Sequence, residues 1–126
     1  MSGRGPVDGP LVVLDVEYVR HSFVLVLLNI GQDVAYRPRV RFSQRLVGAG
    51  GSAVVSDLPL WSRLTLLPPG RRIDVFLDAA NLVLSRGKES TLFTAHVLYA
   101  DADGREFAHA YDHDLTAYSE LPQLEP

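Results

Sequence analysis

Two histidines, His109 and His113, have the spacing that most readily suggests metal chemistry. On an α-helix, residues four apart present both imidazoles on one face. On a strand, the same spacing separates the two residues by roughly 13 Å, at ~3.3 Å per residue. Zinc bonds nitrogen at about 2.0–2.1 Å, so one ion reaches both only at a sharp bend. Because we predict a strand here, we expect two half-buried histidines and no bound metal.

The segment Asp101-x-Asp103-Gly104 has the look of half a calcium-binding loop. An EF-hand needs a ligand at the fifth place and glycine at the sixth, where this chain has Arg105 and Glu106. A tight hairpin turn accounts for the same residues, with Asp at the first place and Gly in a left-handed conformation. We therefore expect a turn, and no cofactor.

Catalytic motifs are missing from the sequence, although Ser, His, Asp and Glu are all present. There is no nucleophile elbow and no His-Glu-x2-His. The cluster Gly48–Gly51 lacks the following Lys-Ser/Thr of a phosphate loop, so we expect a plain loop there. The absence of cysteine excludes a Cys-ligated metal and a thiol nucleophile. We expect no enzyme, and a small hydrolase or metal protein using the His/Asp-rich last strand stays an open alternative.

The composition is that of one ordinary globular domain. The chain has 126 residues, of which 47% are hydrophobic and 21% charged, and a net charge of −3. Such a charge does not draw the whole protein onto nucleic acid or anionic lipid. The strong preference for Arg over Lys suggests a bacterial genome. The longest apolar run, Phe23 to Leu28, is far short of the ~20 residues that span a bilayer, and the first residues do not form a signal peptide. We expect a soluble cytoplasmic protein unless the chain is part of a longer one.

Short apolar runs separated by turn signals predict an all-β fold. We expect tails at 1–10 and 117–126 and a sandwich over 11–116. Residues 78–84 could form one helical turn, with Asp78 as N-cap and Gly87 ending it. Residues 53–67 are expected to hold short edge strands around Pro59. The other expected strands cover 11–19, 22–30, 35–47, 72–77, 91–100 and 105–115.

The clearest hairpin joins residues 91–100 to 105–115. A turn at 101–104 pairs Tyr99 with Phe107 and continues along the strands in steps of two. One face is then apolar and aromatic, and includes both His109 and His113. The opposite face carries Thr94, His96 and Leu98 against Glu106, Ala108, Ala110 and Asp112.

Three motifs connect the chain to a known class of domain: Asn29-x-Gly31-x3-Ala35-x4-Val40-x-Phe42, Leu67-Pro-Pro-Gly70-x4-Val75, and Val97-x-Tyr99-x-Asp101-x2-Gly104. This pattern resembles bacterial immunoglobulin-like modules, namely the fibronectin-III-like and the cell-adhesion-related (CARDB-type) domains. The resemblance implies an immunoglobulin-like sandwich of about seven strands, in which the third strand shares a sheet with the last two. It carries no specific function.

A candidate binding surface follows from that arrangement. Arg37, Arg39 and Arg41 alternate with Val40 and Phe42 and are expected to point outward. In the sandwich they would lie beside His96 and Leu98. The stripe is either a site for an acidic partner or a solvated face whose charges neutralise one another. We expect a non-catalytic structural or protein–protein interaction module, and alternatively an accessory or decoration subunit of a viral particle or bacterial surface machine.

The second expected strand has large apolar side chains on both sides. Phe23, Leu25 and Leu27 point one way, while Val24, Val26 and Leu28 point the other. A sandwich buries only one face of each sheet, so the second set needs cover. Cover could come from the chain itself, through its N-terminal tail or residues 53–67, or from a second copy in a symmetric homodimer. We favour the homodimer.

Overall fold

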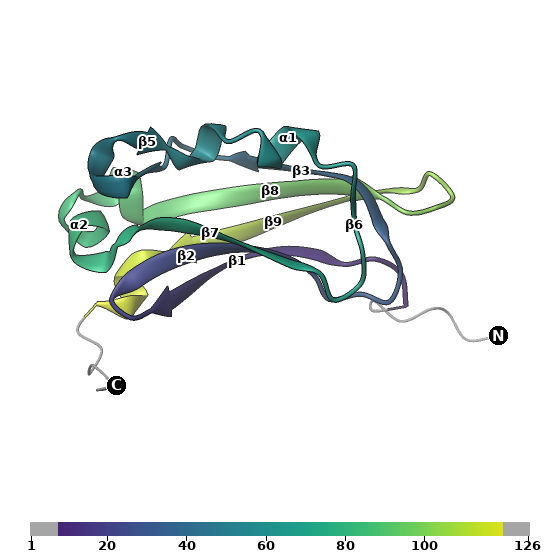
Figure 1. The fold of residues 1–126 in the computed structure, drawn as a ribbon, viewed down its shortest axis with the longest axis horizontal. Helices are drawn as coiled ribbons and strands as arrows, with labels where there is room; N and C mark the ends of the chain where they lie inside the picture. Colours follow the sequence, from purple (N-terminus) through teal and green to yellow (C-terminus); the bar gives the residue numbers. More distant parts are fainter. Residues whose placement is uncertain (1–7, 120–126) are drawn as a thin grey trace.

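The computed structural model describes residues 8–119 and folds them into two antiparallel sheets that pack face to face (Figure 1). The first sheet has the order β1 (Val12–Val19), β2 (Ser22–Asn29), β7 (Arg72–Ala79). The second has the order β6 (Leu66–Leu67), β3 (Ala35–Phe42), β8 (Leu92–Ala100), β9 (Glu106–Asp114). The strands β4 (Val47–Gly48) and β5 (Ala53–Val54) pair only with each other. The predicted all-β sandwich is confirmed, while its immunoglobulin-like type stays a prediction.

Short helices fill the connections between the strands. They are α1 (Leu60–Arg63), α2 (Ala80–Ser85), α3 (Lys88–Thr91), and the 3-10 turns η1 (Ala49–Gly51), η2 (Val55–Asp57) and η3 (Leu115–Tyr118). In Figure 1, α2 and α3 lie at the opposite end of the sandwich from the tip of the β8–β9 hairpin. None of the helices in the described part is both long enough and apolar enough to cross a bilayer.

The core lies between the two main sheets and follows the alternation of each strand. Phe23, Leu25 and Leu27 of β2 are fully buried and meet Ala95 and Val97 of β8 in one cluster. Burying a side chain of the size of Leu or Phe contributes about 1.5–3 kcal/mol. Because strand side chains alternate with period two, this inward set fixes which residues face outward.

The predicted β8–β9 hairpin is confirmed in detail. Tyr99 pairs with Phe107, and the register continues without a break to Leu92 and Asp114. The amide of Gly104 donates to the Asp101 carbonyl at 3.1 Å, and Gly104 has a φ of 83°. A glycine is favoured there because a Cβ is strained at positive φ.

Asn29 ties three segments together at one end of the sandwich. Its side chain is fully buried, and its Nδ2 donates to the carbonyls of Asp33 and Leu67 at 2.9 Å each. Its Oδ1 accepts from the amides of Leu11 and Gly31. A Cβ on Gly31 would lie 2.1 Å from the Gly9 carbonyl oxygen, so any larger residue at position 31 would clash with the backbone. The Asn29-x-Gly31 motif therefore has a structural role.

Residues 53–67 differ from the one or two short edge strands that were predicted around Pro59. Only two residues at each end are extended, and η2 and α1 occupy the middle. Trp61 on α1 is 3% exposed, and its Nε1 donates to the Val55 carbonyl at 2.8 Å. Its ring packs edge-on against Phe42 of β3 at 5.1 Å. The large ring needs a core position, which a flat edge strand does not give it.

Two local predictions around β7 were wrong. Asp78 is not an N-cap: α2 begins after Ala79 without a side-chain cap, and Asp78 belongs to β7. The glycine cluster is not a plain loop, because Gly48 lies in β4 directly against β7. A Cβ on Gly48 would come within 2.0 Å of the Leu77 carbonyl oxygen, so this glycine permits a close backbone approach.

The described ends of the chain are anchored to the sandwich. The Gly9 carbonyl accepts from the Gln32 amide at 3.0 Å. At the other end, the ring of Tyr118 lies 5.7 Å from that of Phe23. Both residues fall within segments that we expected to be tails; residues 1–7 and 120–126 lie outside the described part.

Candidate functional site

The second sheet brings together most of the residues predicted for partner binding. Arg39 of β3 pairs with Leu98 of β8, and Leu98 pairs with Ala108 of β9. In the adjacent row, Arg41 pairs with His96, and His96 pairs with Ala110. These six residues lie on the outer face of the sheet, and we call them the β8 face: Arg39, Arg41, His96, Leu98, Ala108 and Ala110.

Arg37 does not continue the alternation of Arg39 and Arg41. The register of β3 against β8 shifts between Tyr36 and Arg39, so one extra residue is inserted there. Arg37 has a φ of 49°, and its amide donates to the Thr65 carbonyl at 2.8 Å. The Pro38 that follows gives no amide to the ladder, and it is buried. Arg37 thus lies beside the β8 face, displaced by the bulge.

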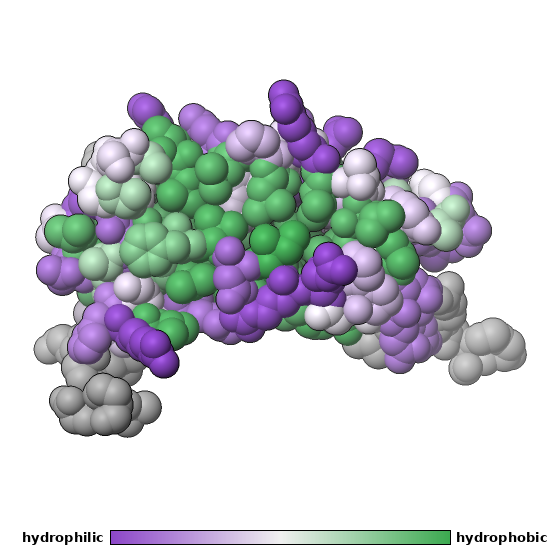
Figure 2. All heavy atoms as spheres, in the orientation of Figure 1, coloured by the Kyte–Doolittle hydropathy of each residue, from purple (hydrophilic) through white to green (hydrophobic). Residues whose placement is uncertain are grey.

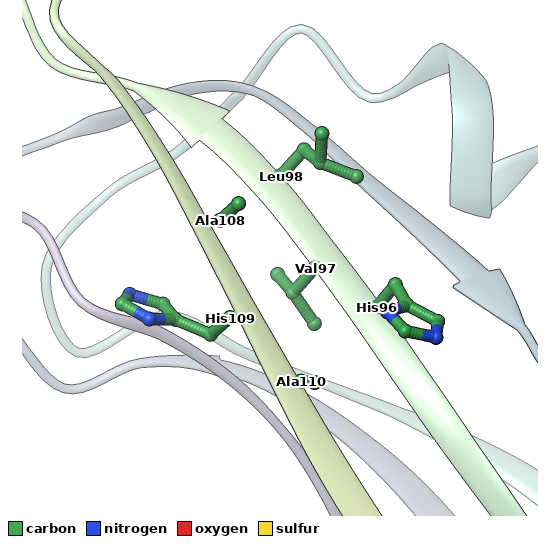
Figure 3. A pocket seen from close by; sticks show the side chains of 6 residues that line it. All are labelled: His96, Val97, Leu98, Ala108, His109 and Ala110. Carbon is green, nitrogen blue, oxygen red and sulfur yellow. The ribbon is translucent and has the colours of Figure 1, made fainter.

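A shallow hollow of about 250 Å³ lies on the β8 face (Figure 3). Ala108 and Ala110 have small side chains, and larger side chains at these two positions would fill the hollow. His96 and Leu98 lie beside the two alanines. Figure 3 shows the ring of His109 directed away from His96 and Leu98. Leu98 is 41% exposed at the wall of this hollow. The hollow is therefore an apolar depression open to solvent.

Charged groups flank the hollow on both sides. Arg39 and Arg41 form a basic column on β3, while Glu106 and Asp112 lie on β9, at the two ends of its alanine pair. The Thr94 hydroxyl donates to Asp112 Oδ1 at 2.6 Å. An apolar centre with a charged rim is the anatomy of a protein interface.

The two histidines of β9 belong to the inner side of the strand. His113 Nε2 lies 2.9 Å from the Leu14 carbonyl oxygen; because a carbonyl only accepts, this nitrogen carries a proton. His109 Nε2 lies 2.8 Å from the Tyr99 hydroxyl. Within residues 8–119, no group of three or more His, Cys, Asp or Glu side chains is placed to hold a metal ion. The predicted half-buried strand histidines are confirmed.

Aromatic side chains close the side of the sandwich where β1 and β9 meet. The hydroxyls of Tyr111 and Tyr118 donate to the carbonyls of Val12 and Val16 at 3.0 and 3.3 Å. Together with His113 on Leu14, these groups give a donor to each of the alternate carbonyls of Val12, Leu14 and Val16 on β1. Burial raises the pKa of Tyr111 above its ordinary value. The alternating aromatic side chains of β9 could be predicted from the sequence. The β1 carbonyls to which Tyr111 and His113 bond could not.

The second set of apolar side chains on β2 is covered in part by the chain itself. Val26 is 1% exposed and pairs with Asp15 on β1 and Asp74 on β7. Arg72 of β7 donates to Asp74 Oδ1 at 2.7 Å and to Glu17 of β1 at 2.5 Å. Since β2 lies between β1 and β7, this guanidinium crosses over β2. The hydrogen bonds to Glu17 and Asp74 raise the pKa of Arg72. Val24 and Leu28 remain half-buried.

Asp78, which was predicted to cap a helix, is a buried carboxylate near the other end of β7. Asp78 accepts from the amides of Gly50 and Ala79 at 3.0 and 2.9 Å, and from Arg86 Nη2 at 2.7 Å. Burial alone would raise the pKa of Asp78, but the hydrogen bonds from Arg86, Ala79 and Gly50 outweigh it and lower the pKa. Arg86 also donates to the Val47 carbonyl, so this cluster locks β4 and η1 to β7.

The turn aspartates also have a structural use. Asp101 Oδ1 accepts from the amides of Asp103 and Arg105, at 2.9 Å each. This is the local capping that favours Asp at the first position of a turn.

A family model with the description "Domain of unknown function (DUF8453)" matches residues 8–119, which covers the whole of the described sandwich. Comparisons with curated proteins and with solved structures gave no match.

Proposed function

We propose that this chain, which belongs to the DUF8453 family, is a non-catalytic protein–protein interaction module that binds through the β8 face. The observation that carries the proposal is the exposed apolar hollow at Leu98, Ala108 and Ala110, in the middle of a sheet whose rim is charged. Leu98 and Ala108 are paired across the ladder and Ala110 is the next outward residue on β9, and a contiguous exposed apolar patch favours association more than the same groups scattered singly.

The hollow fits a protein side chain better than a small substrate. Ligand pockets enclose their ligand and direct several polar groups at it. Here the floor is two alanine methyl groups, and the wall combines Leu98 with one imidazole, His96. A leucine or valine side chain from a partner would fill such a depression and exclude water from it.

The sheet order supports a second part of the proposal, that the domain is of the immunoglobulin-like, fibronectin-III-like type. The third long strand, β3, lies beside the last two strands, β8 and β9, and β1, β2 and β7 form the opposite sheet. This order agrees with the motif resemblance and separates the sheet that carries the β8 face from the sheet that carries Val26.

Self-association is a second candidate, on a different surface. Phe76 of β7 is 54% exposed and pairs with the half-buried Val24. Figure 2 shows an apolar area across the face of the molecule on which β7 and α1 lie. We propose that the homodimer interface is formed by Phe76 and Val24. Val26 would not take part, because Arg72 spans it.

The test of the proposed function is photo-cross-linking from the β8 face. p-Benzoylphenylalanine replaces Leu98 in one variant and Val19, which is 43% exposed on β1, in a matched control. After irradiation of the cells that make the protein, we expect a discrete adduct with one other protein from position 98 only. Adducts of equal yield from both positions, or none from position 98, would contradict the proposal.

A further inference from the structure

We propose that the outer edge of β9 accepts an extended segment of a partner protein as an additional antiparallel strand. The segment would place apolar side chains over Ala108 and Ala110 and basic side chains opposite Glu106 and Asp112. This inference rests on the proposed function and specifies how the partner binds and what its chemistry is.

The hairpin register determines which backbone groups of β9 are available. The Asp101 amide donates to the Arg105 carbonyl at 2.9 Å, which makes this pair a hydrogen-bonded one. Hydrogen-bonded and non-hydrogen-bonded pairs alternate along an antiparallel ladder. Phe107, His109, Tyr111 and His113 therefore bond to β8, and the residues between them direct N–H and C=O away from it. Those outward residues are Glu106, Ala108, Ala110 and Asp112.

β9 is nine residues long and ends its sheet, and no strand of residues 8–119 pairs with its other side. A long edge of this kind is a template for another strand. Two of the four outward residues of β9 are alanines, whose small side chains allow the backbone of a partner strand to come close.

The other edges of the sandwich are less available. The carbonyls of Val12, Leu14 and Val16 on β1 already accept from Tyr111, His113 and Tyr118. The edge of β3 lies beside β6 and α1. Gly48 of β4 lies against Leu77 on β7. The long free edge of the described chain is thus β9.

The hollow of the β8 face adjoins the open edge. Ala108 and Ala110 belong both to the outward backbone set and to the lining of the hollow. A paired strand has its side chains on alternating faces, so every second one would stand beside these two methyl groups. In strand addition, main-chain hydrogen bonds supply affinity and pockets for alternate side chains supply specificity. The hollow is in the place where such a pocket is needed.

The charges on β9 favour a basic segment over a second copy of the same strand. Glu106 and Asp112 flank the alanine pair on the outer face. If two copies of β9 paired with Ala108 opposite Ala110, Glu106 would face Asp112 twice, and like charges directly opposite each other are destabilising. A segment with Lys or Arg at both positions gains the opposite-charge pairs instead.

A synthetic peptide tests the mode of binding directly. The probe is acetyl-Lys-Thr-Leu-Thr-Leu-Thr-Lys-amide, and its controls carry Glu in place of Lys or N-methyl groups on both leucines. Backbone amide exchange, followed by NMR, is the readout. We expect the amides of Ala108 and Ala110 to exchange about tenfold more slowly with the probe and to be unaffected by either control. Protection that survives N-methylation, or no protection at Ala108 and Ala110, would overturn the inference.

A pair of protein variants separates this inference from the proposed function. Ala110→Pro removes one outward N–H and is compatible with an edge strand, while Ala102→Pro, at the second place of the 101–104 turn and outside the β8 face, serves as the control. In cross-linking from position 98, we expect the adduct to fall about tenfold with Ala110→Pro and to persist with Ala102→Pro. An adduct that persists with Ala110→Pro would contradict strand addition and leave the proposed function standing. If position 98 gives no adduct in the parent protein, the proposed function fails, and the peptide experiment still decides the inference.

Discussion

The Tyr111 hydroxyl on β9 donates to the Val12 carbonyl on β1 at 3.0 Å, across the seam between the two sheets. Tyr111→Phe leaves that carbonyl without its donor in a partly buried place and is expected to cost about 1–2 kcal/mol of unfolding free energy. Urea denaturation measures the loss. Tyr36→Phe on the outer side of β3 is the control and is expected to cost far less. Equal losses would show that the seam bond is not a stabilising one.

The Tyr111 hydroxyl is also expected to make the stability of the protein fall at alkaline pH. Burial raises the pKa of Tyr111 and Tyr99, so the folded state holds these protons more tightly than the unfolded state. Their contribution to stability is complete below the ordinary tyrosine pKa of 10.0 and is lost as pH rises beyond it. We expect the unfolding free energy to fall above that pH, and less steeply in Tyr111→Phe. Identical alkaline slopes for the two proteins would refute this assignment.

Asp78 is expected to make the stability of the protein fall at acid pH. Its lowered folded-state pKa means that its contribution is complete above the ordinary value of 3.8 and is lost as pH falls through the folded-state pKa. Asp78→Asn is expected to cost about 1–3 kcal/mol near neutral pH, because Arg86 loses its partner. The variant should also show a weaker acid dependence than the parent protein. Thermal unfolding across an acid pH series measures both effects, and an unchanged acid profile would contradict the role of Asp78.

The turn glycine of the hairpin gives a local test of the backbone. Gly104 has a φ of 83° with no heavy atom within 4 Å of an added Cβ, so conformational strain is the only cost of alanine. We expect Gly104→Ala to destabilise the fold by about 1 kcal/mol. Gly9→Ala, at a glycine that also has open space around it, should cost less. The comparison is made by chemical denaturation of the two variants side by side.

Val26 tests what covers the outer side of β2. A glutamate at this 1% exposed position would place a charge beneath Arg72, among the carboxylates of Asp15, Glu17 and Asp74. We expect Val26→Glu to destabilise by about 3 kcal/mol or more, since burying a poorly paired charge is among the costliest substitutions. Val19→Glu, at a 43% exposed site, is the control. A Val26→Glu protein as stable as the Val19→Glu control would contradict this account of what covers β2.

The hairpin was predictable because one local signal fixed its register. Asp101 to Gly104 determine the turn, and alternation then places every side chain from Phe93 to His113 on its face. The neighbouring rows Arg39–Leu98 and Arg41–His96 additionally required β3 to lie beside β8, which the motif resemblance supplied.

Long-range side-chain contacts could not be predicted in the same way. Asp78 was expected to cap a helix, because a local rule cannot see Gly50 and Arg86 approach it from other segments. Arg72 crosses β2 to reach Glu17, fifty-five positions away in the chain, so the cover of Val26 was invisible in the sequence. The bulge at Arg37 likewise depends on pairing with β8 and on the Thr65 carbonyl.

The central claim is that the β8 face binds a protein partner, and calorimetric titration with the partner recovered by cross-linking tests it most directly. We expect Leu98→Asp to weaken the affinity by about a hundredfold or more, since a charge would replace the apolar wall of the hollow. Phe76→Ser, on the opposite sheet, should leave the affinity unchanged. Equal affinities for Leu98→Asp and the parent protein, or a loss with Phe76→Ser alone, would contradict the account.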